Sequence, residues 1–280
     1  MDETINRNQI EEVNMRKFGI EIEAMLPSSR TKDELADYLN NSVNCRSEGY
    51  NHTTQTYWKV VTDASLPYGG IEVVSPVLEG DNGMRDLKLV LQEMLSFGCT
   101  VNRSCGIHIH QDASDFDASN LKALVMLYSK CEKSIDSIMP KSRRSSQWAK
   151  KLTRVTRSKN PTEIWEKISH DSETDINTVA QMILPNRYCK LNTQAYRVHG
   201  TIEFRQHGGS LDFEKIASWI MLTNAMMNWA KDNNKYAIDR RHSPKFKWLM
   251  KHVGEAKCDF NFLPARNYLE ARKQHFQTQA

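Results

Sequence analysis

The sequence predicts an α+β fold built on a mostly antiparallel sheet, with flanking helices and a helical insertion. Four segments alternate charged residues with β-branched or aromatic ones, which is the pattern of strands that bury one face and keep the other polar. Short turns join two pairs of extended segments, as in antiparallel hairpins. Elsewhere apolar residues recur at helical spacing. Hairpins combined with separate helices indicate the α+β class.

The first hundred residues predict three strands and two helices. A capping box at Thr31 and Glu34 begins a helix that runs to about Asn41. A second helix, with Asp81 as its expected N-cap, ends at Gly98. The expected strands are Phe18–Met25, Tyr57–Val61 and Gly70–Val74, the last two forming a hairpin.

The rest of the chain predicts a strand through His108 and His110, and then mainly helices. Asp115 or Asp117 is the expected cap of a long helix, and Pro161 occupies the first position of another. Further helices are expected over 175–184, from Asp212, near Ser243–Pro244 and from Ala265, and a second hairpin is expected to join Arg187–Ala195 to Gly200–His207.

No Pro-, Gly- or Ser-rich linker divides the 280 residues, so one domain is expected over 1–280, with the helical insertion at about 115–185 and a basic helical tail at about 231–280. The first residues lack the apolar core of a signal peptide, and no apolar run is long enough to span a bilayer. The expected location is cytoplasmic. The six scattered cysteines contain no C-x-x-C pair and are expected to be reduced thiols.

Charge is distributed unevenly. Lys141–Lys159 contains eight basic residues and no acid, and the last fifty residues hold eleven basic residues against five acidic ones. Since the net charge is +4, these segments of +8 and +6 leave −10 for the rest of the chain. This pattern favours divalent cations bound among the acidic strands and a polyanion that approaches the basic flanking segments. Lys141–Lys159 is interpreted as a solvated, mobile surface.

The strand Cys105–Gln111 carries the strongest functional signal. Its alternation puts His108 and His110 on one face and two isoleucines on the other. If the four alternating segments share one sheet, its polar face presents Glu21, Glu23, Glu72, His108, His110, Glu203 and Arg205. A single Glu or His in such a strand is usually a solvent-facing residue. A solvated face would also mix Lys, Ser and Thr among its acids, which these strands do not do.

Several carboxylates with one imidazole suit a pair of Mg²⁺ ions, with Mn²⁺ also accepted, better than they suit zinc. Arg205 is placed to stabilise charge on a transferred phosphoryl group, and a salt bridge to the acidic cluster is the competing interpretation. Arg187 is a second candidate for the same task. No P-loop motif occurs.

Taken together, five motifs resemble the amidoligase family, a relative of glutamine synthetase and glutamate–cysteine ligase. The resemblance extends from about Phe18 to Trp229, and its motifs are Phe18–Glu23, Trp58–Pro76, Val101–His110, Asn192 and Thr201–Arg205. It implies a glutamine-synthetase-like curved, mostly antiparallel sheet and an ATP-dependent carboxylate–amine ligase. The chain is much shorter than glutamine synthetase and lacks a recognisable ammonia or glutamate pocket, so the resemblance does not imply the substrates.

The resemblance also implies roles for individual residues. Glu21, Glu23, Glu72, His108 and Glu203 are implied as metal ligands. His110, Arg187 and Arg205 are implied to lie at the nucleotide phosphates. Glu72, Arg187 and Arg205 are expected to be the catalytic residues.

Three functions are weighed. The leading one is a ligase that uses ATP and Mg²⁺ to join a small-molecule or peptide carboxylate to an amine, through an acyl phosphate. The second is a metal-dependent hydrolase, which the hairpins that precede the H-x-H strand disfavour. The third is an inactive module that binds nucleic acid through its basic segments, and it has no need for the acidic set. A homo-oligomer is compatible with all three.

Overall fold

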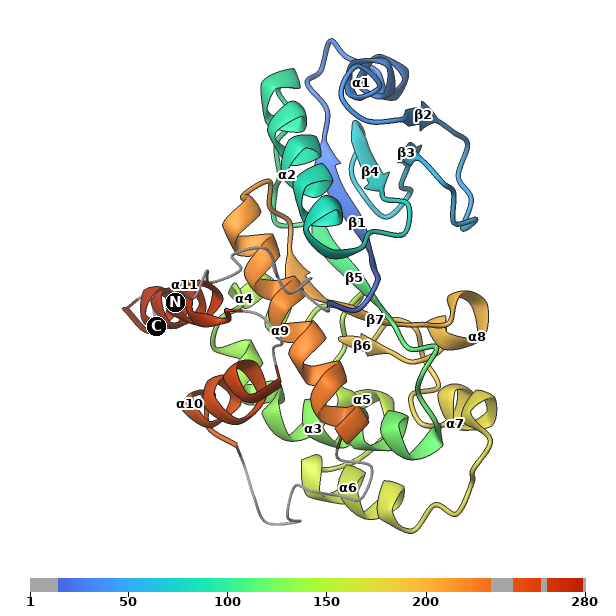
Figure 1. Ribbon diagram of the computed structural model, residues 1–280, viewed down its shortest axis with the longest axis vertical. Helices are drawn as coiled ribbons and strands as arrows, with labels where there is room; N and C mark the ends of the chain where they lie inside the picture. The colour runs from blue at the N-terminus through green and yellow to red at the C-terminus, as the bar shows by residue number, and fades with distance from the viewer. Residues whose placement is uncertain (1–14, 233–243, 258–260, 279–280) are drawn as a thin grey trace, which may run out of the picture.

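The alternation of isoleucine with charged residues gives the central sheet one apolar and one polar face. Ile20 and Ile22 of one strand and Ile107 and Ile109 of its neighbour are fully buried on the apolar face. The computed structural model describes residues 15–232, 244–257 and 261–278. Its seven-stranded open sheet has the order β2-β3-β4-β1-β5-β7-β6, and the strands that carry the acids and histidines are neighbours at its centre (Figure 1).

Every pair of neighbouring strands is antiparallel except β2 and β3, so the sheet is mixed and mostly antiparallel, as expected. The expected strands β1 and β4 have the predicted bounds, and β3 with β4 forms the expected hairpin. The seven strands are β1 (Phe18–Met25), β2 (Cys45–Ser47), β3 (Trp58–Thr62), β4 (Gly70–Val74), β5 (Gly106–Asp112), β6 (Leu191–Asn192) and β7 (Thr201–Gly208).

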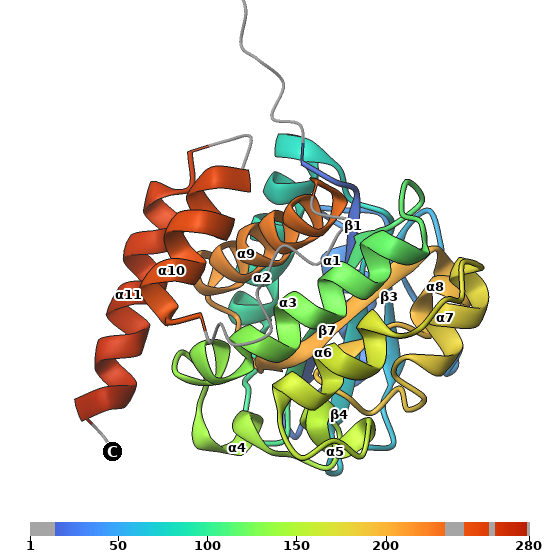
Figure 2. The ribbon, with the colours of Figure 1, turned by 90° about the horizontal axis from the view of Figure 1, so that it is seen from below.

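Helices cover the apolar face of the sheet. Rings of α3 and α9 pack on β7, where Tyr128 and Trp219 flank Phe204. The red helices α10 and α11 lie outside α9 and α3 (Figure 2). The helices are α1 (Lys32–Leu39), α2 (Gly80–Phe97), α3 (Ala118–Asp136), α4 (Lys141–Arg144), α5 (Leu152–Val155), α6 (Pro161–Ser169), α7 (Ile176–Met182), α8 (Ala195–His199), α9 (Phe213–Asp232), α10 (Phe246–Leu249), the π-helix η1 (Met250–Glu255) and α11 (Leu263–Thr278).

Side-chain caps confirm most predicted helix starts. The capping box of Thr31 is present, and Asp117 caps α3 while Asp175 caps α7. Asp81 is not a cap, because α2 begins one residue earlier, at Gly80. The backbone of Leu78 is held by two hydrogen bonds to Phe18 on β1, so the chain leaves the sheet edge directly into the helix. Of the predicted tail helices, one start falls at Ser243, outside the described residues.

The predicted second hairpin is only partly correct. The expected strand Arg187–Ala195 is reduced to β6, because Asn192 Oδ1 accepts a hydrogen bond from the Gln194 backbone and turns the chain into α8. The neighbouring strand β7 also pairs with β5, and the register of that pairing shifts between Ile107 and Ile109 of β5. Such a bulge re-aims the following side chains. His207 consequently stacks on Trp219 of α9, on the apolar side.

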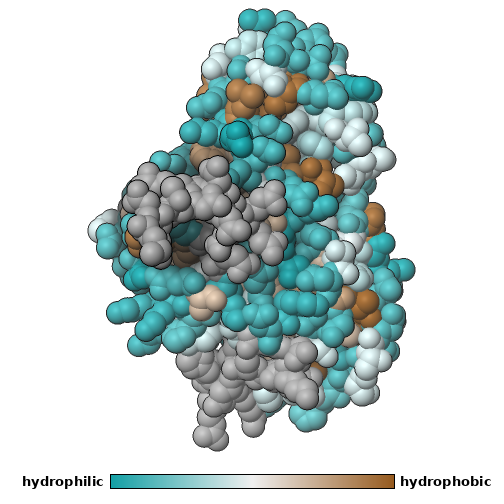
Figure 3. Space-filling model, viewed as in Figure 1, coloured by the Kyte–Doolittle hydropathy of each residue, from teal (hydrophilic) through white to brown (hydrophobic). Residues whose placement is uncertain are grey.

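The basic segment Lys141–Lys159 is not simply a solvated surface. It forms α4 and α5, and the Arg143 side chain is buried against β7. The cysteines among the described residues are free thiols, as predicted, while Cys258 lies outside that range. No helix within the described ranges is long and apolar enough to cross a membrane. On the face shown in Figure 3 the surface is mostly hydrophilic, with hydrophobic residues in small separate groups.

A buried ion-pair network joins β7 and the segment before β6 to α3. The Lys190 ammonium is fully buried and lies 2.8 Å from Glu132 Oε1 and 2.6 Å from Asp136 Oδ1. Gln206 of β7 also donates to Asp136 and accepts from the Tyr128 hydroxyl at 2.6 Å. Loss of the ammonium leaves two largely buried carboxylates uncompensated, which is far more costly than loss of an exposed ion pair.

Lys190→Met is therefore expected to lower the free energy of unfolding by about 3 kcal/mol, measured by urea denaturation. Lys133→Met, on the exposed side of the same helix α3, is the matched control and is expected to change stability by less than about 0.5 kcal/mol. Adding Glu132→Gln to Lys190→Met is expected to recover part of the loss. Equal stabilities of Lys190→Met and the control would contradict the structural role of the network.

Candidate active site

Strand register brings the predicted site residues opposite one another. In β1 and β5, Glu21 faces His108. In β1 and β4, Glu23 faces Glu72. Glu203 of β7 faces His110 of β5 and also Asn192 of β6. Directly opposed residues on one sheet face have Cβ atoms about 5 Å apart, so these five strands converge on one polar surface.

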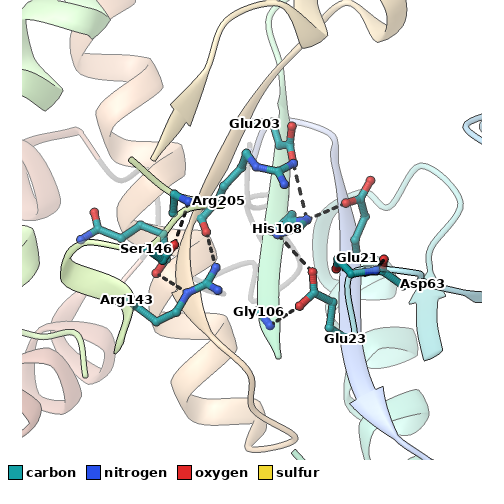
Figure 4. A network of polar contacts seen from close by, with 12 residues as sticks. Glu21, Glu23, Asp63, Gly106, His108, Arg143, Ser146, Glu203 and Arg205 are labelled. Atoms are coloured by element: carbon teal, nitrogen blue, oxygen red, sulfur yellow. Dashed lines mark hydrogen bonds and ion pairs between the residues drawn. The ribbon is translucent and has the colours of Figure 1, made fainter. Parts of the chain in front are cut away.

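The His108 imidazole lies at the centre of this surface (Figure 4). Its Nδ1 lies 2.7 Å from Glu21 Oε2 and 3.6 Å from Glu203 Oε1, and its Nε2 lies 3.5 Å from Glu23 Oε1. The second histidine is close by, with His110 Nε2 3.3 Å from Glu21 Oε1. The prediction that the carboxylates of β1 and β7 meet the H-x-H pair is thus confirmed as geometry.

One acid of the cluster was not predicted. Asp63, in the turn after β3, joins Glu23 and Glu72 in a group whose oxygens lie within 4.8 Å of one another. The sequence signal for it was its place in the motif Trp58–Pro76, but a turn aspartate is normally explained by the turn itself. Two further groups satisfy the same distance, and they consist of Glu21 with Glu72 and His108, and of Glu21 with His110 and Glu203.

The acids perturb one another strongly. Burial, together with the charges of Glu21 and Glu23, raises the pKa of Glu72 well above its usual value. Burial also opposes ionisation of Glu21, but the neighbouring His108 and His110 imidazoles outweigh it and hold the pKa of Glu21 well below its usual value. The cluster therefore carries more negative charge than its own histidines neutralise.

Two polar atoms in the site lack a hydrogen bond. Arg205 Nε is buried and has no hydrogen-bond partner among the described residues, and His110 Nε2, although it lies 3.3 Å from Glu21 Oε1, makes no well-aligned hydrogen bond to them. His110 Nδ1 lies 3.0 Å from the Thr201 hydroxyl, which orients the ring. Buried polar groups without partners are uncommon and mark places where an ion, water or ligand belongs.

Arg205, Arg187 and Arg143 are among the arginines that lie in the same hollow as the acidic cluster. Arg205 forms an ion pair with Glu203, which is the competing interpretation considered for it, while its Nε stays without a partner. Arg187 stacks on the Tyr188 ring, with its guanidinium carbon 4.9 Å from the ring centroid. Arg143 is the residue that sequence reasoning missed, because it belongs to a basic run in which nothing distinguishes it from its neighbours.

Arg143 is held firmly by β7. It donates from Nη2 to the Arg205 carbonyl at 2.7 Å and from Nε to the Gln206 carbonyl at 3.3 Å. It has no carboxylate partner within 4 Å among the described residues. In Figure 4, Arg143 and Arg205 lie on one side of Gly106, while Glu21, Glu23 and Asp63 lie on the other.

All predicted site residues line one cavity of about 1200 Å³. Its size exceeds that of a typical small-ligand pocket of about 300–1,000 Å³, so it has room for more than one substrate. The cavity is lined by the eight predicted residues Glu21, Glu23, Glu72, His108, His110, Arg187, Glu203 and Arg205, and also by Asp63, Arg143 and Asn192.

The donor set fits divalent cations. Its oxygen donors with one or two imidazoles are the ligands that Mg²⁺ accepts and Mn²⁺ tolerates, and cysteine is absent from the three groups. The directly opposed Glu23 and Glu72 repel each other unless a cation lies between them. Burial, and after it the charges of the neighbouring acids, raises the pKa of Glu72, and a bound cation would oppose this rise.

Fold and site together define an α+β protein with a carboxylate- and arginine-lined cavity on the polar face of a mostly antiparallel sheet. A model of the family described as "Putative amidoligase enzyme" matches residues 14–227, and the chain belongs to this family. The resemblance drawn from the motifs is thereby confirmed, and membership makes the chain a ligase-type enzyme. No curated protein matches the sequence.

Saturating Mg²⁺ or Mn²⁺ is expected to raise the melting temperature by several degrees, since a ligand at ~100 times its Kd adds about 2.7 kcal/mol. Glu72→Gln is expected to act in two opposite ways. It removes a repelling charge, so it raises the melting temperature in chelator, and it removes a ligand, so it reduces the response to metal. Differential scanning fluorimetry with and without EDTA measures both effects.

Glu79→Gln is the matched control, because Glu79 is an exposed acid just before α2. It is expected to keep the wild-type response to metal. A Glu72→Gln protein with an unchanged response would contradict the assignment of this cluster as a cation site.

Proposed function

We propose that the chain is an ATP- and Mg²⁺-dependent carboxylate–amine ligase. In this reaction a substrate carboxylate oxygen attacks the γ-phosphorus of ATP, giving an acyl phosphate and ADP. An amine then attacks the acyl carbon, phosphate leaves, and an amide or isopeptide bond remains. The proposal includes a single catalytic domain, a cytoplasmic location, and an acid and an amine that are small molecules or peptides.

The observation that supports the proposal best is the convergence of acids and arginines in one cavity. Phosphoryl transfer needs cations near the phosphate oxygens and little other covalent assistance from the protein. The cavity provides two kinds of groups for this, since the acids can hold metal ions and the arginines can contact phosphate directly. Family membership favours ligase chemistry over hydrolysis.

Glu21, Glu23, Glu72, His108 and Glu203 are the proposed metal ligands, with Asp63 as an additional one. Bound Mg²⁺ supplies charge neutralisation at the phosphates of ATP. Asn192 positions Glu203 by donating from Nδ2 to its Oε2 at 2.7 Å. The Gly106 amide similarly donates to Glu23 Oε2 at 2.5 Å, so that the two acids at the two ends of the cluster are both fixed.

The arginines and His110 are the proposed phosphate-binding groups. Arg205 can use its unpartnered Nε, and Arg143 keeps N–H groups that β7 does not use. Arg187, at the rim, is proposed to bind the nucleotide or the acid as it enters. His110 carries a raised pKa, because the charges of Glu21 and Glu203 outweigh the effect of burial, and it can donate to a phosphate oxygen.

ADP release with a panel of amino acids, peptides and polyamines tests the proposal. Wild type is expected to release ADP only with a matching acid and amine, and Glu23→Ala is expected to lower the rate by at least ~100-fold, because several kcal/mol of charge stabilisation is lost. Glu79→Gln should match wild type. Equal background turnover in wild type and Glu23→Ala would contradict the proposal, and amide cleavage without nucleotide would indicate a hydrolase.

A second experiment addresses the arginine that the sequence did not reveal. Arg143→Lys keeps the charge but loses the planar fork that contacts two carbonyls and the cavity, so kcat for ADP release is expected to fall by ~100-fold. Arg144→Lys is the matched control, since Arg144 is adjacent and donates to the Met139 carbonyl instead. A wild-type kcat for Arg143→Lys would exclude a role in the reaction.

A further inference from the structure

A second cavity lies in the helical region between β5 and β6. It has a volume of about 670 Å³, within the range of small-ligand pockets. Its walls come from α5, α6 and α7, the yellow-green part of the ribbon in Figure 2. The charged residues that line it are Lys150, Arg154, Arg157, Lys167 and Asp171, and the larger apolar ones are Val155, Ile164, Ile168, Met182 and Ile183.

The lining has a clear excess of positive charge. Lys167 is already engaged, donating to the carbonyls of Thr156 and Arg157 and pairing with Glu163. Arg154 and Arg157, in contrast, have no acidic partner within 4 Å among the described residues. Neither guanidinium therefore has an ion-pair partner in the part of the chain that the structure describes, and Asp171 is the one acid among the residues that line the cavity.

The backbone at Arg157 is held in a conformation that side chains rarely adopt. Its φ is +51°, and it is the one non-glycine residue with positive φ in the described part of the chain. The bond from Lys167 to its carbonyl, and that from the Ser158 amide to the Thr153 carbonyl, secure the turn. Such strain costs on the order of 1 kcal/mol and persists only where the surroundings impose it.

The second cavity adjoins the candidate active site. Pro185 lines both cavities, Asn186 lines the second one, and Arg187 and Tyr188 line the active-site cavity. Lys150 lines the second cavity, and its backbone amide donates to the carbonyl of Tyr188, which lines the active-site cavity, at 3.0 Å. The two cavities are therefore neighbours along the segment 185–188.

We propose that the second cavity is a subsite for an acidic peptide segment of the substrate, whose reacting carboxylate lies in the active site. The inference rests on the proposed ligase function. Free guanidinium groups match carboxylates, and the apolar lining matches the aliphatic parts of a peptide. Nucleic acid fits less well, because no aromatic ring lines this cavity for base stacking.

Fluorescence anisotropy of a fluorescein-labelled Glu-Leu-Glu-Leu-Glu peptide tests the subsite without turnover. Arg154→Gln and Arg157→Gly are each expected to weaken binding by about threefold, and the double variant by about tenfold, as for partly exposed ion pairs. Glycine suits the positive φ at 157, so this variant keeps the fold. Lys151→Gln is the matched control, because Lys151 is an exposed cation of the same segment that does not line the cavity.

Wild-type affinity in Lys151→Gln, together with weak binding of the neutral peptide Gln-Leu-Gln-Leu-Gln, would support the subsite. An equal loss in Lys151→Gln, equal binding of the neutral peptide, no binding by wild type, or tighter binding of an oligothymidylate of equal charge would overturn it. Peptide binding that depends on Arg154 and Arg157 without any ADP release would overturn the ligase proposal alone.

Discussion

The structure depends on placing like charges together on the polar face of the sheet. Glu23 and Glu72 are directly opposed across β1 and β4, and Glu21 and Glu203 lie on either side of His108. Opposed acids destabilise a sheet, and burial increases the cost because solvent no longer screens them. The raised pKa of Glu72 is the direct expression of this cost. A sheet that keeps such a cluster needs compensation from elsewhere in the molecule.

The compensation comes from the other face of the same strands. Because side chains alternate along a strand, each acid of β1 is preceded by an isoleucine that is buried on the opposite face of the sheet. Burying such a side chain is worth roughly 1.5–3 kcal/mol. A slip of register by one residue would exchange the two faces, so the apolar packing that stabilises the fold also fixes which acids and histidines meet.

The division of each strand into an apolar and a polar face explains how much of the fold and site the sequence predicts. Period-two alternation predicted β1, β4 and β5 and the acids and histidines they carry, because it is a local property of the chain. It could not predict Arg143, whose burial depends on packing against β7 about sixty residues later. It also failed at Arg187–Ala195, where a polar side chain, Asn192, turns the backbone after two paired residues. Sequence patterns therefore revealed the acidic half of the site more fully than its cationic half.

Gly106 joins these two halves. Its amide donates to Glu23, and a Cβ at this position would lie 2.7 Å from Arg143 Nη2. A side chain at this position would therefore displace the Arg143 guanidinium from its place against β7. One short stretch of β5 thereby fixes an acid on one side and an arginine on the other (Figure 4). Under the proposed function, a phosphate bound between them would meet the proposed metal ligands and a guanidinium that is already in place, so little reorganisation would be needed as charge moves during transfer.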